Sequence, residues 1–396
     1  MQEILINRIE KYTEIVLLEN GKLKEYYKDD FKSKRREGNI YVGIVTDILK
    51  GMQAAFVNIG TEKNSFIHLK DVLEKIDETK ETTKNECKTD ISDVLKIGQK
   101  LLVQVKKDSN EQKGARISTH INLPGKYIAL MPETEIITVS QKIEDKKEQE
   151  RLIKLVKENI SPNIGAIIRT SAEGKSQEIV DDIKSLEKKW NKIKKEYNNY
   201  NENSPKLILK AQSIVEKMIT DLPENSIERI TVNDKKDYKK LQELKNQNTY
   251  MSNIEIRIEE NANIIEQYNL RNDIEKIENR KIWLKCGGFI TIDKTEALTA
   301  IDVNTGKYTG KKDLEQTIFK VNKEATIEIA KQLRLRDIGG IIIIDYIDMH
   351  NIEDKNKIEE LLKEELKKDR TKTQVEGFTK LDLLEMTRKH ICSHKE

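Results

Sequence analysis

The chain has 396 residues, which is too long for one compact core and predicts two to four domains. Charged residues make up 36% of it and aromatic residues 5%, and no apolar stretch approaches the roughly 20 residues of a membrane span. The net charge is only +3, so any basic surface for nucleic acid has to be local. The N-terminus has no signal-peptide pattern, so we expect a cytoplasmic protein without a membrane span.

The N-terminal third reads as short strands. Residues 1–35 alternate apolar and polar around Asn20 and Gly21, which predicts a β-hairpin. Residues 36–118 hold about five short β-rich runs, which predict a small barrel of the OB type. The polar segment 74–90 is nearly devoid of apolar residues and reads as a loop inserted in that barrel.

The middle of the chain, residues 119–280, is predicted to combine helices with short strands. Residues 119–174 mix short strands with turns. Residues 175–200 have the 3.6-residue apolar period of an amphipathic helix, and residues 206–222 read as a second helix. Residues 223–280 combine a strand near IERITV with charged helical segments.

Residues 281–396 have the clearest pattern of the chain. We expect strands at 283–293 and 296–304, followed by an amphipathic helix over 311–336. The run IIIIDYI at 341–347 is wholly apolar but for its aspartate, which predicts a strand buried on both faces, and another helix follows it. This order predicts a right-handed β-α-β unit with parallel strands.

Two aspartates end the two strands that this unit joins. Asp302 and Asp345 are therefore expected to be neighbours, because functional groups gather at the C-terminal ends of parallel strands. Adjacent carboxylates repel unless a cation lies between them, and Mg²⁺ prefers one or two carboxylates with water and phosphate. Asn304 faces the same side as Asp302. Turn-forming aspartates that cap strand ends explain the pattern equally well. Asp348 is expected to be a turn residue or a group that supports the ligands, rather than a third ligand.

Candidate RNA contacts lie in the predicted barrel. Alternation along AAFVNIG places Phe56 on the outer face, where an aromatic ring offers a stacking platform for a base. Phe66 is a second candidate of this kind. Lys113, with Lys106 and Lys107, would supply charge for phosphates. The alternative is ordinary, because phenylalanine in a small barrel usually belongs to the core.

A candidate phosphate pocket follows the barrel. Arg169 and Thr170 come at a strand end, and together they offer a guanidinium fork and a hydroxyl. Gly125 would allow close approach of the backbone. The alternative is a surface arginine in an ordinary ion pair.

Cysteine spacing gives no sign of a metal or disulfide framework. Cys87, Cys286 and Cys392 share no CxxC pattern, which fits thiols that stay reduced in the cytoplasm. The terminal run from His390 through Cys392 to His394 lacks zinc-finger spacing, so a frayed end is favoured over a metal site.

Several of these motifs together resemble one family. The runs TEALTAIDVNTG, NKEA with IAKQLRLRDIGGIIIIDYIDM, and LLEMTRK resemble the catalytic domain of the ribonuclease E/G family. GMQAAFVNIG and the run KGAR at 113–116 resemble its RNA-binding barrel. The resemblance spans essentially the whole chain. Members are single-strand endoribonucleases of bacteria and plastids.

The resemblance implies an α+β multidomain fold. An RNase H-like domain is split around an inserted OB-fold barrel and a 5′-sensor, and a deoxyribonuclease-I-like α/β catalytic domain follows. The implied boundaries are 1–35 and 215–280 for the two RNase H-like parts, 36–118 for the barrel, 119–214 for the sensor and 281–396 for the catalytic domain.

The resemblance also implies roles for the candidate residues. Asp302 and Asp345 would be Mg²⁺ ligands, with Asn304 assisting at the scissile phosphate. The implied RNA contacts are Phe56, Phe66 and Lys113, and the implied 5′-monophosphate pocket is Gly125, Arg169, Thr170 and Lys372.

The chain departs from the family pattern in three places. Lys372 stands where the family often has arginine, and a lysine lacks the bidentate fork. The segment 139–145 is less basic than usual, so weaker sensing of the 5′ end is expected. The sequence ends at KHICSHKE without the CPxC zinc-link. The family's zinc-linked tetramer is therefore not carried over, while a homodimer through other surfaces stays open.

The expected activity follows from the resemblance. We expect a Mg²⁺-dependent endoribonuclease that cuts single-stranded, AU-rich RNA by a metal-activated water, leaving 5′-phosphate and 3′-hydroxyl ends. Its expected roles are mRNA decay and rRNA or tRNA processing. The alternatives are a catalytically silent RNA-binding protein and a different metal-dependent phosphohydrolase.

Overall fold

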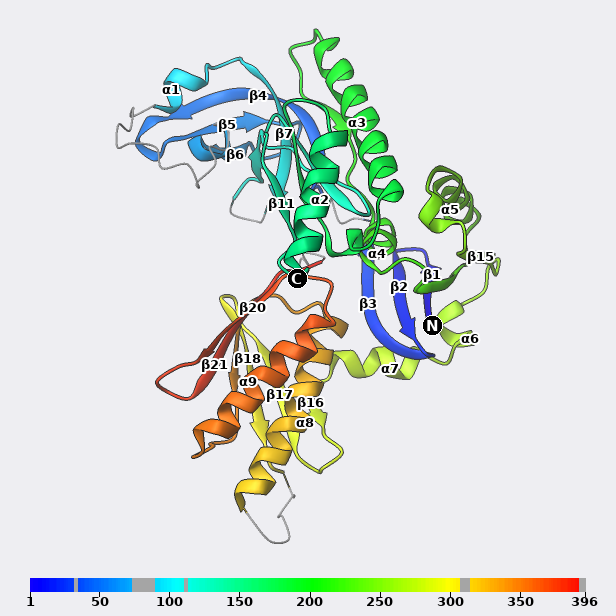
Figure 1. The fold of residues 1–396 in the computed structure, drawn as a ribbon, viewed down its shortest axis with the longest axis vertical. Coiled ribbons are helices and arrows are strands. Elements are labelled where there is room, and N and C mark those ends of the chain that lie inside the picture. The colour runs from blue at the N-terminus through cyan, green and yellow to red at the C-terminus, as the bar shows by residue number, and fades with distance from the viewer. Residues whose placement is uncertain (32–34, 73–89, 110–112, 307–313, 392–396) are drawn as a thin grey trace. The chain divides into compact units, whose positions relative to one another are not determined.

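The computed structural model describes residues 1–31, 35–72, 90–109, 113–306 and 314–391 (Figure 1). The chain divides into two compact units. Unit 1 is Met1–Ser33 with Asp221–Glu396, and unit 2 is Lys34–Thr220. The five-part division expected from the sequence is finer and stays a prediction. The predicted polar loop up to residue 89, Cys87, Cys392 and His394 lie outside the described residues.

The first sheet of unit 1 is built around the predicted hairpin, which is confirmed. Asn20 and Gly21 have φ values of +51° and +74°, as the two central residues of a tight type I′ turn require. The first strand also pairs in parallel with a strand from beyond residue 220, which brings distant segments into one sheet. The strand order is β15 (Glu255–Ile258), β14 (Ile227–Val232), β1 (Gln2–Arg8), β2 (Tyr12–Glu19) and β3 (Lys22–Asp30), and the associated helices are α5 (Lys235–Gln247), α6 (Ile264–Gln267) and α7 (Arg271–Glu275).

The second sheet of unit 1 contains the predicted β-α-β unit. Strands β18 (Leu298–Asn304) and β19 (Gly340–Asp345) pair in parallel, and α8 (Leu314–Leu335) joins them. Helix α9 (Ile352–Lys367) lies beside α8, and both contribute to the core under the sheet (Figure 1). The full order is β16 (Lys281–Trp283), β17 (Phe289–Lys294), β18, β19, β21 (Leu383–Arg388) and β20 (Thr373–Phe378).

Two predictions about this sheet are wrong. The single strand expected at 283–293 is a hairpin of β16 and β17, because Gly287 turns with φ +93° between them. The strand β19 is not buried on both faces. Ile342 and Ile344 are fully buried, whereas Ile341, on the opposite face, is 51% exposed. Only one face of this mixed sheet is therefore packed against the core, and the other face is open to solvent.

Unit 2 contains the predicted OB-type barrel, which is confirmed as a closed barrel of five strands. Pairing of the first strand with the fourth in sequence closes it, and the inward residues form a separate core. The strands are β4 (Ile40–Leu49), β5 (Ala54–Asn58), β6 (Ser65–His68), β7 (Lys100–Lys107) and β8 (Arg116–Ser118), with η1 (Lys50–Met52), η2 (Leu69–Asp71) and α1 (Ile91–Val94) between them.

The helix predicted over 206–222 is only half present. Residues Lys206–Leu209 form β13, which pairs with the edge of β4, and a helix, α4, spans only Ile214–Asp221. Pro205 restricts the backbone just before β13. The backbone of β4 then pairs with residues 206–209, and the local helix pattern gives no sign of this long-range pairing.

A four-stranded sheet and two helices complete unit 2. The helix predicted over 175–200 is confirmed as α3, Gln177–Asn198, and its apolar stripe from Ile179 to Ile193 is buried. Helix α2 (Lys146–Asn159) packs with it around the core of this part. The strands are β9 (Leu123–Pro124), β10 (Ile128–Pro132), β11 (Ile137–Val139) and β12 (Ile164–Ile168), and η3 is Thr170–Ala172.

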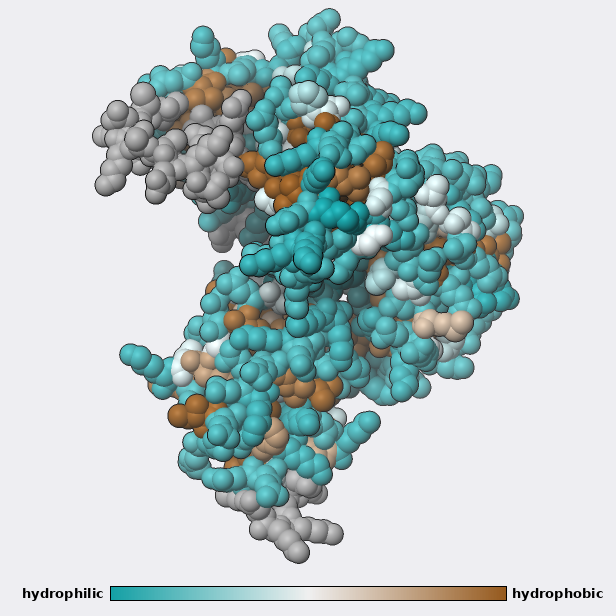
Figure 2. Space-filling model, viewed as in Figure 1, coloured by the Kyte–Doolittle hydropathy of each residue, from teal (hydrophilic) through white to brown (hydrophobic). Residues whose placement is uncertain are grey.

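The surface agrees with the charged composition. The face drawn in Figure 2 is mostly hydrophilic, with small apolar patches. None of the helices within the described ranges combines the length and apolar character that crossing a membrane requires.

Candidate active site

The two predicted aspartates lie side by side. Asp302 and Asp345 are direct register partners at the ends of β18 and β19, and both are exposed on the open face. Backbones of paired strands are about 4.8 Å apart, so the two carboxylates are close enough to repel. Partial burial raises the pKa of Asp345, and the charges of Asp302 and Asp348 raise it further. A cation between the two carboxylates would relieve this repulsion.

Asn304 acts on the first of these carboxylates. Its side-chain Nδ2 donates a hydrogen bond of 2.6 Å to Asp302 Oδ2, from two residues along the same face. The described residues contain no group of three or more Asp, Glu, His or Cys that would hold a metal. A pair of carboxylates still fits Mg²⁺, since this ion keeps several waters and phosphate oxygens rather than a full protein cage.

The basic neighbours of the aspartates were missed by sequence reasoning. The pKa of Arg280 is raised by its pairing with Asp293 and also by the charge of Asp302. Lys281 is the register partner of Thr291, which is itself the partner of Asp302. Lys281 and Asp302 are 21 residues apart in sequence, and only the register of the strands brings them into one row.

The two predicted aromatic contacts of the barrel lie together. Phe56 and Phe66 are register partners on β5 and β6, with ring centroids 6.3 Å apart and planes at 71°. Both are half-buried, whereas Ala55 and Val57 on either side of Phe56 are fully buried. The rings therefore lie on the outer face, as alternation predicts, and their role in binding stays a prediction.

Lys113 is held beside this aromatic pair by a close backbone approach. A Cβ on the next residue, Gly114, would come within 1.9 Å of the Asn64 carbonyl oxygen, so only glycine fits there. The Phe66 amide donates to the Ala115 carbonyl oxygen at 2.7 Å, which ties the two segments together. Lys113 is exposed, whereas Lys106 donates to Gln104 Oε1 at 2.9 Å and so directs its charge inward.

The predicted phosphate pocket forms one connected cluster. Arg169 Nη1 donates to the Gly125 carbonyl at 2.8 Å, and Thr170 Oγ1 lies 3.0 Å from Ser140 Oγ. A Cβ on Gly125 would lie 2.5 Å from Asp182 Oδ2, so a side chain there would have to displace this carboxylate. The structure thus brings three of the four predicted residues together.

Asp182 is the residue of this cluster that sequence reasoning missed. Its Oδ2 accepts from the amides of Tyr127 at 2.8 Å and Ile128 at 3.1 Å. Burial raises its pKa, although those amides and the charge of Arg169 act to lower it. A signal was present, since Asp182 lies between Ile179 and Leu186 on the buried stripe of α3, where an unpaired carboxylate would be costly.

Lys372, the fourth predicted residue, belongs to unit 1 and is exposed between α9 and β20. Its carbonyl accepts from the Lys389 amide at 2.9 Å. Its part in a phosphate pocket stays a prediction.

Comparison with known proteins places the chain in a class of nucleases with an RNA-binding module. The Ribonuclease E/G family matches residues 122–391, and the S1 RNA binding domain matches residues 34–120. Ribonuclease G of Salmonella typhimurium is 38% identical over 98% of this chain and 79% of its own length, and ribonuclease G of Escherichia coli K12 is equally similar. A putative ribonuclease E of Buchnera aphidicola is 35% identical over 99% of this chain and 96% of its own length.

The chain belongs to the ribonuclease E/G family. The resemblance seen in the sequence motifs is therefore confirmed, and the barrel is the S1 domain of this family member.

Proposed function

We propose that this family member is a Mg²⁺-dependent endoribonuclease that cuts single-stranded, AU-rich RNA and leaves 5′-phosphate and 3′-hydroxyl ends. The observation that carries the proposal is the pair Asp302 and Asp345, in register on an open sheet face, with Asn304 bonded to Asp302. Membership of the family makes the chain an endoribonuclease. The preference for AU-rich RNA and the roles in mRNA decay and rRNA or tRNA processing rest on the family resemblance. The proposed cytoplasmic location rests on the N-terminal sequence and the cysteine pattern.

The open face suits a polymeric substrate. Asp302 and Asp345 would hold the ion, and Asn304 would keep the Asp302 carboxylate oriented toward it. Mg²⁺, when bound, supplies a polarised phosphoryl oxygen and an activated water. A pocket of about 940 Å³ in unit 1 is lined by residues of β16 and α8, with neither aspartate among its lining residues. The proposed site is instead the exposed sheet face with Asp302 and Asp345, which a long chain can cross.

The domain assignments belong to the same proposal. We assign the sheet of β16–β21 with α8 and α9 to a deoxyribonuclease-I-like catalytic domain, and the sheet of β1–β3 with β14 and β15 to an RNase H-like domain. The part of unit 2 that follows the barrel would be the 5′-sensor. A homodimer is compatible with this assignment.

Removing one ring of the barrel pair should weaken RNA binding. Phe56→Ala should weaken the binding free energy for a single-stranded RNA by about 1–3 kcal/mol, because a stacked base loses its aromatic partner. Phe56→Tyr keeps the ring and should bind almost normally. Fluorescence anisotropy with a labelled oligonucleotide measures this, with Phe31→Ala, a 49% exposed ring outside unit 2, as control. Equal affinities of Phe56→Ala and wild type would remove the barrel pair from the RNA path.

The 5′-sensor assignment is tested by the end chemistry of the substrate. Wild type should cut a short RNA with a 5′-monophosphate faster than the same RNA with a 5′-hydroxyl, because Arg169 and Thr170 offer charge and hydrogen bonds to the phosphate. Arg169→Lys should reduce this preference, since lysine lacks the fork that also bonds to Gly125. The 5′-hydroxyl rate serves as the internal control, and a preference that survives the substitution would refute the assignment.

A further inference from the structure

The open face that carries the aspartates also carries an aromatic pair. Trp283 on β16 is the register partner of Phe289 on β17, and Phe289 is the partner of Asn304 on β18. The neighbouring row across the same strands consists of Lys281, Thr291, Asp302 and Asp345. Since cross-strand partners point to the same face, the two rings and the candidate catalytic groups share one surface.

The aromatic pair is built around a lysine. The rings of Trp283 and Phe289 have centroids 5.3 Å apart and planes at 62°. Lys281 Nζ lies 3.4 Å from the centroid of Phe289 and 4.2 Å from that of Trp283. The indole itself is 60% exposed. Tryptophan is enriched at binding surfaces, where one end of the side chain packs against apolar groups and the other is wet.

The position of the cluster matches a substrate that reaches the aspartates. Trp283 lies two strands from Asn304, and Lys281 lies two strands from Asp302, which is about 10 Å in each case. An RNA whose phosphate is at Asp302 and whose chain continues across β17 toward β16 passes over this cluster. A lysine beside an exposed indole suits a nucleotide, whose base stacks and whose phosphate is anionic.

We propose that Trp283, supported by Phe289 and Lys281, is a base-stacking subsite for the single-stranded RNA next to the bond that is cut. This inference rests on the proposed function and extends it to a second stacking platform, distinct from the Phe56 and Phe66 pair of unit 2. Trp283 stacks on a base, and the ammonium of Lys281 is placed to reach a neighbouring phosphate. The subsite binds any base, because every base has a π face.

The two tryptophans of the chain make a direct optical test available. Trp190 is 4% exposed and Trp283 is 60% exposed, so Trp190→Phe leaves one exposed reporter. In this background with Asp345→Asn added to prevent cleavage, single-stranded RNA should quench the fluorescence of Trp283. A duplex of the same length, whose bases are already stacked, should quench it much less. This readout needs no catalysis, so a failure of the proposed activity would leave it interpretable.

Affinity separates a binding role from a structural one. Trp283→Ala should weaken binding of single-stranded RNA by a factor of roughly 5 to 100, as expected for the loss of one stacked base. Trp283→Phe should recover most of that loss, and Leu381→Ala, an 82% exposed side chain in the same unit, should have no effect. Unchanged affinity in Trp283→Ala, or an absence of quenching, would overturn the proposal. So would a shift of Trp283→Ala from dimer to monomer in gel filtration with RNA binding intact, because the ring would then cover a second copy of the chain.

Discussion

Replacing Asp302 or Asp345 by asparagine should reduce cleavage of single-stranded RNA by about 10³-fold. A bound metal ion contributes several kcal/mol to stabilising charge in the transition state, and each 1.4 kcal/mol is a factor of ten. Each substitution removes one of the paired carboxylates that would hold the ion. Asn304→Ala should cost about 10- to 100-fold, because it only releases the Asp302 carboxylate from its 2.6 Å hydrogen bond. Rates measured over a Mg²⁺ titration test all three variants.

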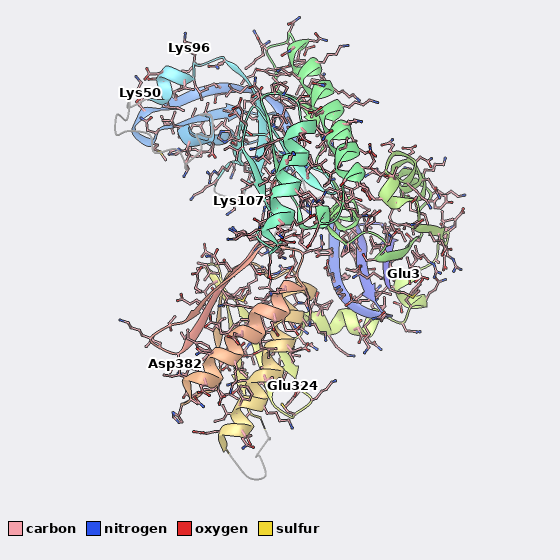
Figure 3. The ribbon with its side chains drawn as sticks, in the orientation of Figure 1. Glu3, Lys50, Lys96, Lys107, Glu324 and Asp382 are labelled. Atoms are coloured by element: carbon pink, nitrogen blue, oxygen red, sulfur yellow. The ribbon has the colours of Figure 1, made fainter. Side chains whose placement is uncertain are left out.

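Stability separates the metal site from the alternative of turn-forming aspartates. Partial burial and, after it, the charge of Asp302 raise the pKa of Asp345, so the two carboxylates repel in the folded protein without metal. Removing one of them should leave thermal stability in a chelating buffer unchanged or increased, whereas loss of a structural cap would lower it. Asp382→Asn is a matched control, since Asp382 lies in the turn between β20 and β21 and pairs with Lys355 at 2.7 Å (Figure 3). A control that loses activity equally would contradict the assignment.

The largest loss of stability should follow from Arg388→Met. Arg388 donates from Nε to Asp369 Oδ2 at 2.8 Å and from Nη1 to Asp337 Oδ1 at 2.9 Å, and all three side chains are buried. The Asp337 carboxylate also accepts from the Ile391 amide, which fixes the end of the described chain. The variant leaves two carboxylates buried without their cation, which costs about 3–5 kcal/mol of unfolding free energy. Urea unfolding measures the loss.

An exposed arginine provides the control for this measurement. Arg257 lies 3.1 Å from Glu259 with 53% of its side chain exposed, so Arg257→Met should cost no more than about 1 kcal/mol. If Arg388→Met does not yield soluble protein, Arg388→Lys keeps the charge without the fork and should show a smaller loss in the same direction. Equal stability of Arg388→Met and wild type would show that the buried network contributes nothing to unit 1.

The same network makes the stability difference between wild type and Arg388→Met depend on pH. Burial acts to raise the pKa of Asp369, but the charge and hydrogen bonds of Arg388 outweigh it, so this pKa lies below its ordinary value. An acid whose pKa falls on folding stabilises the protein above its unfolded pKa of about 3.9, and this contribution is lost as pH falls through the folded pKa. The gap between wild type and Arg388→Met should therefore be widest near pH 7 and narrow below about pH 4.

Much of the candidate site followed from local pattern. A strand, a helix and a second strand in this order predict a parallel pair, and the structure places Asp302 and Asp345 in direct register on it. The alternation around Phe56 likewise predicts its outward position on the barrel. These features depend on neighbours in sequence or on one rule of topology, so one sequence is enough to reach them.

Other features depend on which backbones meet, and the sequence does not show this. Residues 206–209 satisfy a helical pattern, but the edge of β4 makes them a strand. The apolar run of β19 suggests two covered faces, yet both flanking helices contribute to one core and Ile341 stays exposed. The row that joins Lys281 to Asp302 exists only through strand register. Long-range pairing of this kind has no local signature.

The most direct test of the central claim is the mass of the products released from a short, single-stranded, AU-rich RNA in the presence of Mg²⁺. Attack of water on a phosphodiester held at Asp302 and Asp345 predicts fragments with 5′-phosphate and 3′-hydroxyl ends. These fragments should be absent with Asp345→Asn and absent without the metal. Fragments that end in a 2′,3′-cyclic phosphate, or cleavage that persists in Asp345→Asn, would contradict a hydrolytic metal site at these two aspartates.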